Sequence, residues 1–377
     1  MKKNKKIYII IGTRPEAIKM APVINALNNS KQFNVKVFLT GQHADLIKPM
    51  LNLMKINISA ILLKNKSYSL SGLASKLFAV LDKLYTKDRP DLVMVHGDTL
   101  TTFAASTSAF FAGIKVAHIE AGLRTHDLLS PFPEEFNRIV TSYASFLHFA
   151  PTKLAKQNLI NQGIAKKNIY VTGNTVVDSL HQTLQKIEDS PKEFFQIISR
   201  LNSLTGIDLQ SSRLVLITGH RRESFGDSFK NIFQALKNLA NKHQDIFFIY
   251  PVHLNPNVRG PAQEMLSNIY NIKLIEPLNY KEFISLLNLA DLVITDSGGI
   301  QEECPSLGKP LILMREKTER PEILNYKHFK LAGTSASKIY NYSNIFLKQN
   351  IKIKPSNIFG DGKAAERILN ILTMELL

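Results

Sequence analysis

Carboxylate and arginine side chains are concentrated between residues 118 and 138 of this 377-residue chain, in His118–Thr125 and Ser130–Arg138. A charge buried without a partner costs several kcal/mol, so these groups need either solvent or partners. A solvated loop would meet that need. The stretch, however, follows the apolar run Ile114–Ile119, which has the pattern of a buried strand. In open α/β sheets, ligands bind at the carboxyl ends of strands. The position therefore favours a functional site that contains Glu120 and Glu134.

A second carboxylate follows another apolar run, in His96-Gly97-Asp98-Thr99. Asp98 could serve as a general base that points from the end of a strand. It could equally cap the helix that follows. The residues alone leave both readings open.

The first apolar run leads into Gly12-Thr13-Arg14-Pro15-Glu16-Ala17-Ile18-Lys19. Thr13 and Glu16 have the spacing of a capping box, and Pro15 suits a first helical turn. Arg14 and Lys19 beside the helix start could hold an anion. A capped helix with basic surface residues is an equally good interpretation.

Phosphate-binding features also appear in the second half of the chain. Ser297-Gly298-Gly299 joins an apolar run to a helix start, where missing side chains would let a diphosphate approach backbone amides. Glu302 or Glu303 could then accept hydrogen bonds from a ribose. The alternative is a tight strand-to-helix turn. His220, in Gly219-His220-Arg221, could bind a phosphate or carry a proton, although a packed or solvated histidine is the commoner case.

Several classes of site are not predicted. The first half has no Gly-x-Gly-x-x-Gly, and the chain has no Walker-type Gly-Lys-Ser/Thr and no His-Glu-x-x-His. We therefore expect neither a cofactor nor a metal. Cys304 is the single cysteine, which excludes an internal disulfide, and we expect it to be a small buried residue.

The formal net charge is +16. The lysines are scattered rather than set in a stripe with aromatics, so we expect no nucleic-acid binding and favour a phosphate-bearing substrate. No apolar stretch reaches the ~20 residues of a membrane helix. The N-terminal apolar core is too short for a signal peptide. These patterns predict a cytoplasmic protein without a membrane partner.

Short apolar runs alternate with helix-length amphipathic segments along the whole chain. Continuous hydrophobicity indicates strands covered on both faces, hence parallel sheets with helical crossovers. Two such series predict two doubly wound domains, with a boundary near Val176–Ser190 and a final helix over Gly362–Leu377. The runs are Ile7–Ile11, Val35–Leu39, Leu92–Val95, Val116–Ile119 and Phe146–Phe149, then Leu214–Ile217, Ile246–Tyr250, Ile272–Ile275, Leu292–Thr295 and Leu311–Met314.

Taken together, the motifs resemble the non-hydrolysing UDP-N-acetylglucosamine 2-epimerases, over almost the whole chain. The matching words are residues 12–22, 96–99, 120–125, 131–135, 137–138, 172–175, 219–223, 253–258, 297–303 and 318–322. Each motif alone is weak evidence for the family, whereas the number and order of the motifs make the resemblance specific.

The resemblance implies two Rossmann-like domains of the glycosyltransferase-B type that face each other across a cleft. Residues 1–176 with 362–377 would form the first domain, and residues 177–361 the second, UDP-binding one. It also implies a homodimer that interconverts UDP-N-acetylglucosamine and UDP-N-acetylmannosamine. In that reaction UDP leaves and returns through a bound glycal, and the product supplies surface polysaccharide or glycoconjugate synthesis.

By the same resemblance, individual residues receive roles. The catalytic groups would be Asp98, Glu120, Glu134 and His220, although which carboxylate is base and which acid stays open. The substrate-binding groups would be Arg14, Lys19, Phe283, Ser297, Gly298, Gly299, Glu303 and Arg320. Gln42, Glu134, Arg221 and His253 match positions of a second UDP-sugar site that activates some relatives. That site's further Gln is Asp45 here and its Arg has no counterpart near Lys64–Ser69, so we expect weak or absent activation.

Three alternatives remain at this stage. One is a hydrolysing epimerase, which releases free N-acetylmannosamine and UDP. Another is a UDP-sugar glycosyltransferase of the same fold, although the acid-rich first half shows no acceptor-binding pattern. The third is a basic protein that binds nucleic acid or a membrane surface.

Overall fold

The computed structural model describes residues 4–41, 44–64, 68–221, 225–349 and 353–377. The chain divides into two compact units. Unit 1 is Met1–Ser179 with Phe359–Leu377, and unit 2 is Leu180–Ile358. The boundary expected after residue 176 falls in the first turn of helix α7 (Thr175–Glu188).

Unit 1 is built on a seven-stranded parallel sheet in the order β3-β2-β1-β4-β5-β6-β7. The order changes direction between β1 and β4, which is where doubly wound sheets bind ligands. Residues 7–11 of β1 are all buried, because helices cover both faces of the sheet. The strands are β1 (Lys5–Ile11), β2 (Phe33–Leu39), β3 (Ala60–Ile61), β4 (Leu92–His96), β5 (Lys115–Ile119), β6 (Leu147–Ala150) and β7 (Ile169–Val171).

The helices of unit 1 connect successive strands. They are α1 (Arg14–Ser30), α2 (Ala44–Leu53), α3 (Leu70–Lys87), α4 (Leu100–Phe111), α5 (Glu134–Ala144) and α6 (Lys153–Asn161), with the start of α7. The predicted capping box forms at α1: Thr13 is the N-cap, Glu16 completes the box, and proline lies in the first turn.

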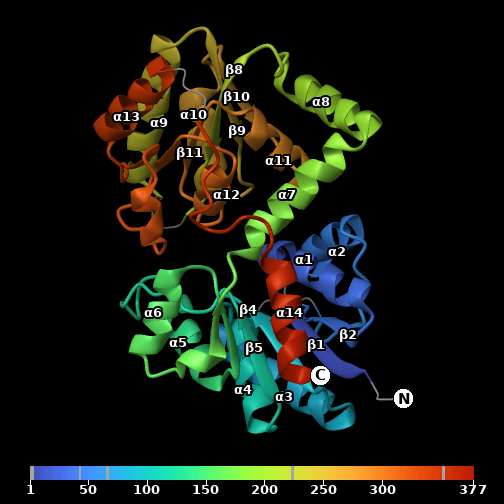
Figure 1. Cartoon of the computed structure of the whole chain (residues 1–377). Coiled ribbons are helices and arrows are strands. Elements are labelled where there is room, and N and C mark those ends of the chain that lie inside the picture. Colours follow the sequence, from blue (N-terminus) through green and yellow to red (C-terminus); the bar gives the residue numbers. More distant parts are fainter. Residues whose placement is uncertain (1–3, 42–43, 65–67, 222–224, 350–352) are drawn as a thin grey trace. The chain divides into compact units, whose positions relative to one another are not determined.

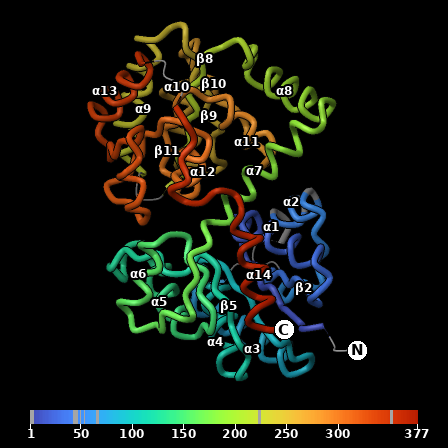
Figure 2. Tube along the Cα trace, in the orientation of Figure 1, coloured from blue at the N-terminus to red at the C-terminus, as the bar shows by residue number. Residues whose placement is uncertain are grey.

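The last helix, α14 (Ala364–Leu376), returns to unit 1 and packs against α1. Figures 1 and 2 show it in red among the blue and green elements of this unit. The Asp178 carboxylate caps it by accepting hydrogen bonds from the amides of Ala364 (3.2 Å) and Ala365 (2.8 Å). The final helix expected over residues 362–377 is therefore present, and it completes the first unit.

Unit 2 has a six-stranded parallel sheet in the order β10-β9-β8-β11-β12-β13, which repeats the same reversal between β8 and β11. Its strands are β8 (Arg213–Thr218), β9 (Ile246–Pro251), β10 (Ile272–Ile275), β11 (Leu292–Thr295), β12 (Leu311–Leu313) and β13 (Phe329–Leu331). Its helices are α8 (Pro191–Thr205), α9 (Asp227–Lys242), α10 (Pro256–Leu266), α11 (Tyr280–Leu289), α12 (Ile300–Ser306) and α13 (Ala336–Gln349).

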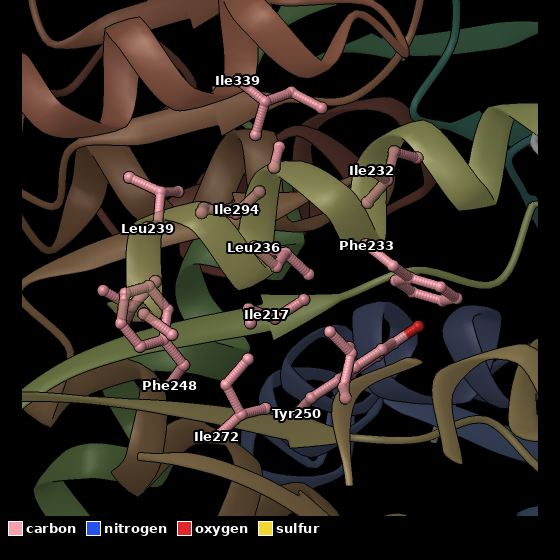
Figure 3. Close-up of a cluster of buried hydrophobic side chains, with 14 of the residues drawn as sticks. Ile217, Ile232, Phe233, Leu236, Leu239, Phe248, Tyr250, Ile272, Ile294 and Ile339 are labelled. Carbon is pink, nitrogen blue, oxygen red and sulfur yellow. The ribbon is translucent and has the colours of Figure 1, made fainter. Parts of the chain in front are cut away.

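The core of unit 2 lies between α9 and its sheet. Figure 3 shows Phe233, Leu236 and Leu239 of α9 over strand residues that include Ile217 and Ile294, all of them buried. Each fully buried side chain of this size contributes about 1.5–3 kcal/mol. This packing fixes the strand ends at which the polar residues of the unit lie.

The two doubly wound parallel sheets confirm the predicted fold class. All ten predicted strands are present within a residue or two of their expected bounds. Three strands were missed, β3, β7 and β13, and each lies at an edge of its sheet. Within the described residues, no helix combines the length and apolar character needed to cross a membrane.

Candidate functional site

Glu120 is the centre of the polar cluster in unit 1. It directly follows β5, and its backbone φ of +62° lies in the left-handed region that non-glycine residues seldom adopt. Its buried carboxylate forms an ion pair with Lys19 of α1 and accepts a 2.7 Å hydrogen bond from the Asn174 amide. Strained backbone of this kind is concentrated at functional sites. The cluster thus holds one carboxylate in a fixed orientation at the carboxyl edge of the sheet.

His96, the last residue of β4, lies beside Glu120. Its Nε2 is 3.9 Å from Glu120 Oε2 and, within the described residues, makes no hydrogen bond. Burial lowers the pKa of His96 to about 4, although the charge of Glu120 opposes this shift. A neutral imidazole therefore faces the carboxylate near pH 7.

Asp98, half-buried after β4, is held by Arg138 of α5. The Arg138 Nε and Nη2 atoms lie 2.9 and 2.7 Å from Asp98 Oδ2. The helix-cap alternative for Asp98 is wrong, because Thr99 occupies the N-cap of α4 and its side chain accepts from the Thr102 amide. The guanidinium thus fixes the orientation of this carboxylate, as a general base requires.

Two adjacent glutamates begin α5 and differ in their surroundings. Glu135 is fully buried, accepts from the amides of Thr125 and His126 at 3.0 Å, and pairs with Arg138. Its role is therefore to fix the 125–126 loop to the helix. Glu134, the predicted catalytic residue, is half-buried at the first position of α5.

The start of α1 brings Arg14 and Lys19 to the same edge, Arg14 exposed and Lys19 buried. The Glu16 carboxylate already accepts from the amides of Gly12 (2.9 Å) and Thr13 (2.6 Å). Its other oxygen accepts from the Thr99 hydroxyl at 2.7 Å. Glu16 thus occupies amides that an anion would use and connects α1 to the loop after β4.

In unit 2, the predicted glycine turn follows β11 and opens the short helix α12. Gly298 lies against an ion pair: a Cβ added there would be 3.0 Å from Arg320 Nη1 and 3.1 Å from Glu319 Oε1. At Gly299 a Cβ would meet nothing within 4 Å. The turn therefore has one packed glycine and one that borders open space, next to Ser297.

Arg320 is held beside this turn by two carboxylates. Its Nε lies 2.7 Å from Glu302 and its Nη1 lies 3.0 Å from Glu319, which also pairs with Arg315. Burial alone would raise the pKa of Glu319, but the charges of Arg320 and Arg315 outweigh it and lower the pKa to about 2. Of the other predicted nucleotide contacts, Glu303 is buried in α12 and Phe283 is half-buried on α11.

His220 follows β8, and its side chain is 45% exposed. Its Nδ1 lies 3.5 Å from Oδ1 of the buried Asp296, and its ring stacks on that of His253 with centroids 5.4 Å apart. Arg221 is next in the chain, with Nη2 4.0 Å from Glu319. Of the predicted second-site residues, Arg221 and His253 thus flank His220, and Glu134 begins α5 in unit 1. Gln42 lies outside the described residues.

The part of the chain that the structure describes contains no group of three or more His, Cys, Asp or Glu side chains arranged to hold a metal ion. Cys304 is buried in α12, as predicted, and burial raises the pKa of its thiol. A high thiol pKa disfavours the reactive thiolate form, so we expect this cysteine to be unreactive.

Each unit thus gathers its predicted residues at one edge of its own sheet. Unit 1 brings Arg14, Lys19, Asp98, Glu120 and Glu134 to the strand ends, and unit 2 does the same for His220, Ser297, Gly298, Gly299, Glu303 and Arg320. The sequence alone assigns no role to the residues that lie against these groups, which are His96, Arg138, Asn174, Asp296 and Glu319. A signal existed for two of them, because His96 ends β4 and Asp296 follows β11, both strands that the apolar runs predict.

Comparison with known proteins gives a consistent result. The family model described as UDP-N-acetylglucosamine 2-epimerase matches residues 25–373. A UDP-N-acetylglucosamine 2-epimerase of Campylobacter jejuni is 42% identical over 373 residues, 98% of this chain and 97% of the relative. The enzyme of the same name from Escherichia coli K12 is 42% identical, over 97% of this chain and 98% of its own.

Solved structures agree. The UDP-GlcNAc 2-epimerase of Neisseria meningitidis bound to UDP-GlcNAc matches with a TM-score of 0.92 at 40% identity, over 98% of this chain and 100% of that one. The Methanocaldococcus jannaschii enzyme in complex with UDP-GlcNAc and UDP matches with a TM-score of 0.84 at 35% identity, over 98% and 99%. Since the family model matches most of the chain and these relatives are 42% identical over nearly its whole length, the chain belongs to the UDP-N-acetylglucosamine 2-epimerase family.

Proposed function

We propose that this protein interconverts UDP-N-acetylglucosamine and UDP-N-acetylmannosamine without net hydrolysis. A base removes the proton from carbon 2 of the sugar while the bond from carbon 1 to UDP breaks, which leaves a glycal. A proton then adds to the opposite face of carbon 2, and UDP returns to carbon 1. The observation that carries this proposal is the buried Glu120 carboxylate, held by Lys19 and Asn174 beside neutral His96.

The chemistry explains why both units are rich in polar groups. The proton on carbon 2 is weakly acidic, so the departure of UDP must drive its removal, and the charge on the departing phosphate needs fixed cations and amides. We assign the acid and base work to Asp98, Glu120 and Glu134 of unit 1. We assign UDP to His220, Ser297, Gly298, Gly299, Glu303 and Arg320 of unit 2, with Phe283 near the uracil and Arg14 and Lys19 near the phosphates.

Three further points belong to this proposal. The protein acts as a homodimer, which light scattering at working concentration would measure. Its product supplies the synthesis of a surface polysaccharide or glycoconjugate. Catalysis requires no metal, so dialysis against EDTA leaves the rate unchanged.

The experiment is incubation with UDP-N-acetylglucosamine alone in deuterated water, followed by NMR. The proposal expects UDP-N-acetylmannosamine, with deuterium at carbon 2 of the sugar. Free N-acetylmannosamine with an equal amount of UDP would mean a hydrolysing enzyme instead. Consumption only after an acceptor is added would mean a glycosyltransferase.

A further inference from the structure

Asp296 is a buried carboxylate that the proposed chemistry does not yet use. It directly follows β11, its side chain is 1% exposed, and it lies where the strand order of unit 2 reverses. Its Oδ2 accepts hydrogen bonds from the backbone amides of His220 (2.7 Å) and Arg221 (2.8 Å) in the loop after β8. One side chain thus joins the two loops that flank the reversal point.

The second oxygen of Asp296 points toward the imidazole of His220. Oδ1 is buried and, within the described residues, has no hydrogen-bond partner, and Nδ1 of His220 lies 3.5 Å from it. A buried acceptor without a hydrogen bond is unfavourable, so Oδ1 favours a donor beside it. At 3.5 Å the contact is longer than a hydrogen bond, but contacts of this kind commonly shorten when substrate binds.

We propose that Asp296 is a positioning residue for His220: its Oδ1 accepts a hydrogen bond from Nδ1–H of His220 and so directs Nε2 to the departing phosphate. In a neutral imidazole, the hydrogen bond made by one ring nitrogen decides which of the two nitrogens carries the proton. With Nδ1–H engaged by Asp296, uptake of one proton from solvent places a second N–H on Nε2. That N–H donates to the phosphate oxygen on which charge develops.

The other neighbours of His220 do not serve this purpose. Of the described charged and titratable groups, Asp296, Arg221 and His253 act on it. His253 stacks on the ring face, and its Nδ1 already accepts from the Asn255 amide. Burial lowers the pKa of His220, Arg221 and His253 lower it further, and the charge of Asp296 is the one that opposes them. Asp296 is therefore the group that favours the imidazolium.

The inference rests on the proposed function, because it gives His220 a role in that reaction. It can nevertheless be tested by a measurement that needs no catalysis. In ¹⁵N-labelled wild-type protein, the imidazole nitrogen shifts give the tautomer and pKa of His220, with the signal assigned by its loss in His220→Asn. We expect the Nδ1–H tautomer in the neutral ring. A neutral ring protonated on Nε2 in the wild type would overturn the inference, whatever any variant does.

Asp296→Asn keeps an oxygen for the two backbone amides and turns an NH₂ group toward Nδ1. We expect the His220 tautomer to switch to Nε2–H, its pKa to fall, and kcat to drop by about 10²- to 10⁴-fold, as for an orienting aspartate in a catalytic triad. KM changes far less, because the lost interaction belongs to the transition state. An unchanged tautomer with an unchanged kcat would overturn the inference.

Asp291→Asn is the matched control. Asp291 precedes β11, and its Oδ2 accepts the Leu214 amide at 2.7 Å, so it joins the same two strands at their other ends. We expect wild-type tautomer and kcat in this variant; the same losses as in Asp296→Asn would point to a general structural effect and overturn the inference. If the wild type makes no UDP-N-acetylmannosamine, the proposed function fails, while the tautomer still decides the placement of Asp296.

Discussion

At the scale of single residues, Glu120 shows how the fold prepares a carboxylate for chemistry. A carboxylate that acts as a base toward a carbon-bound proton must be ionised, oriented and shielded from water. Lys19 and Asn174 supply the charge and the orientation, and burial supplies the shielding. Asp98 is oriented in a comparable way by the guanidinium of Arg138, although its side chain is only half-buried.

We expect Glu120→Gln to lower kcat by about 10²- to 10⁴-fold, because an amide cannot accept a proton from carbon 2. The measurement is the initial rate of UDP-N-acetylmannosamine formation, with the melting temperature recorded alongside. Glu264→Gln on the exposed side of α10 is the control and should retain the wild-type rate. A Glu120→Gln enzyme with normal turnover would remove Glu120 from the catalytic groups.

Whether an interaction could be predicted from the sequence depended on how far apart in the sequence its two residues lie. The capping box of Thr13 and Glu16 was predictable because its members are three residues apart. Arg138 meets Asp98 across 40 residues, and Asn174 meets Glu120 across 54. No local pattern encodes such pairs, because the order of strands in the sheet brings them together.

At the scale of elements, strand length explains which strands the sequence indicated. Interior strands are covered on both faces and read as continuous apolar runs. β3, β7 and β13 have two or three residues and lie at sheet edges, with exposed positions such as Ile61 and Val171. Apolar segments this short do not stand out from the apolar residues of the loops and helices around them.

The start of α12 yields a paired prediction on its two glycines. Gly298→Ala puts a methyl group against the buried ion pair of Arg320 and Glu319, which should destabilise the protein by about 1–3 kcal/mol and weaken UDP binding. Gly299→Ala meets no protein atom, so its melting temperature should equal that of the wild type. Its methyl group enters the space assigned to the diphosphate, and UDP should bind about tenfold more weakly, a change of about 1.4 kcal/mol.

Calorimetry of UDP binding, with a thermal melt of each variant, checks this pair. The two variants separate packing from ligand contact. If Gly299→Ala binds UDP as the wild type does, the diphosphate does not approach this turn.

The contact of α14 with α7 gives a prediction on pH. Burial raises the pKa of Asp178 to about 6, although its hydrogen bonds from Ala365 and Ala364 oppose the shift. Between about pH 4 and 6 the native state therefore holds a proton that the unfolded state has released. The stability that this group contributes is greatest at low pH and falls by about 3 kcal/mol as pH rises through that window.

We expect the melting temperature of the wild type, relative to Asp178→Asn, to fall between pH 4.5 and pH 7. Asp361→Asn is the contrast, since Asp361 pairs with Arg367 of α14 and this hydrogen bond lowers its pKa to about 2. Its stabilisation is present above the unfolded pKa and lost only in stronger acid. Relative to the wild type, Asp361→Asn should therefore show little change over the same range. Parallel behaviour of the two variants would contradict the Asp178 assignment.

At the scale of the whole molecule, each unit repeats one strand order and places its polar residues at the reversal point. Gly12 and Asp98 flank that point in unit 1, and His220 and Asp296 flank it in unit 2. Parallel sheets with helical crossovers favour this placement, whatever the chemistry. The fold class was therefore readable from apolar runs alone, whereas the chemistry depended on which side chains follow them.

We expect initial rates to rise hyperbolically with UDP-N-acetylglucosamine, with a Hill coefficient of about 1. The reason is the departure from the resemblance noted in the sequence: where it would place a Gln the chain has Asp45, and residues 64–69 contain no Arg. The check is a rate curve from well below to well above KM, with the reverse reaction from UDP-N-acetylmannosamine as control. Sigmoidal rates, or a reverse reaction that starts only after a trace of UDP-N-acetylglucosamine is added, would show activation.

The return of α14 to unit 1 has a consequence for how the protein is made. Asp178 and the amide of Ala364 that it caps are 186 residues apart in the chain, and all but the ends of that interval belong to unit 2. The ribosome thus delivers the whole of unit 2 before it delivers the helix that completes unit 1. Until residues 364–376 emerge, the apolar side of α1 that receives them stays uncovered. Unit 1 is therefore the last of the two units to be completed, although most of it is synthesised first.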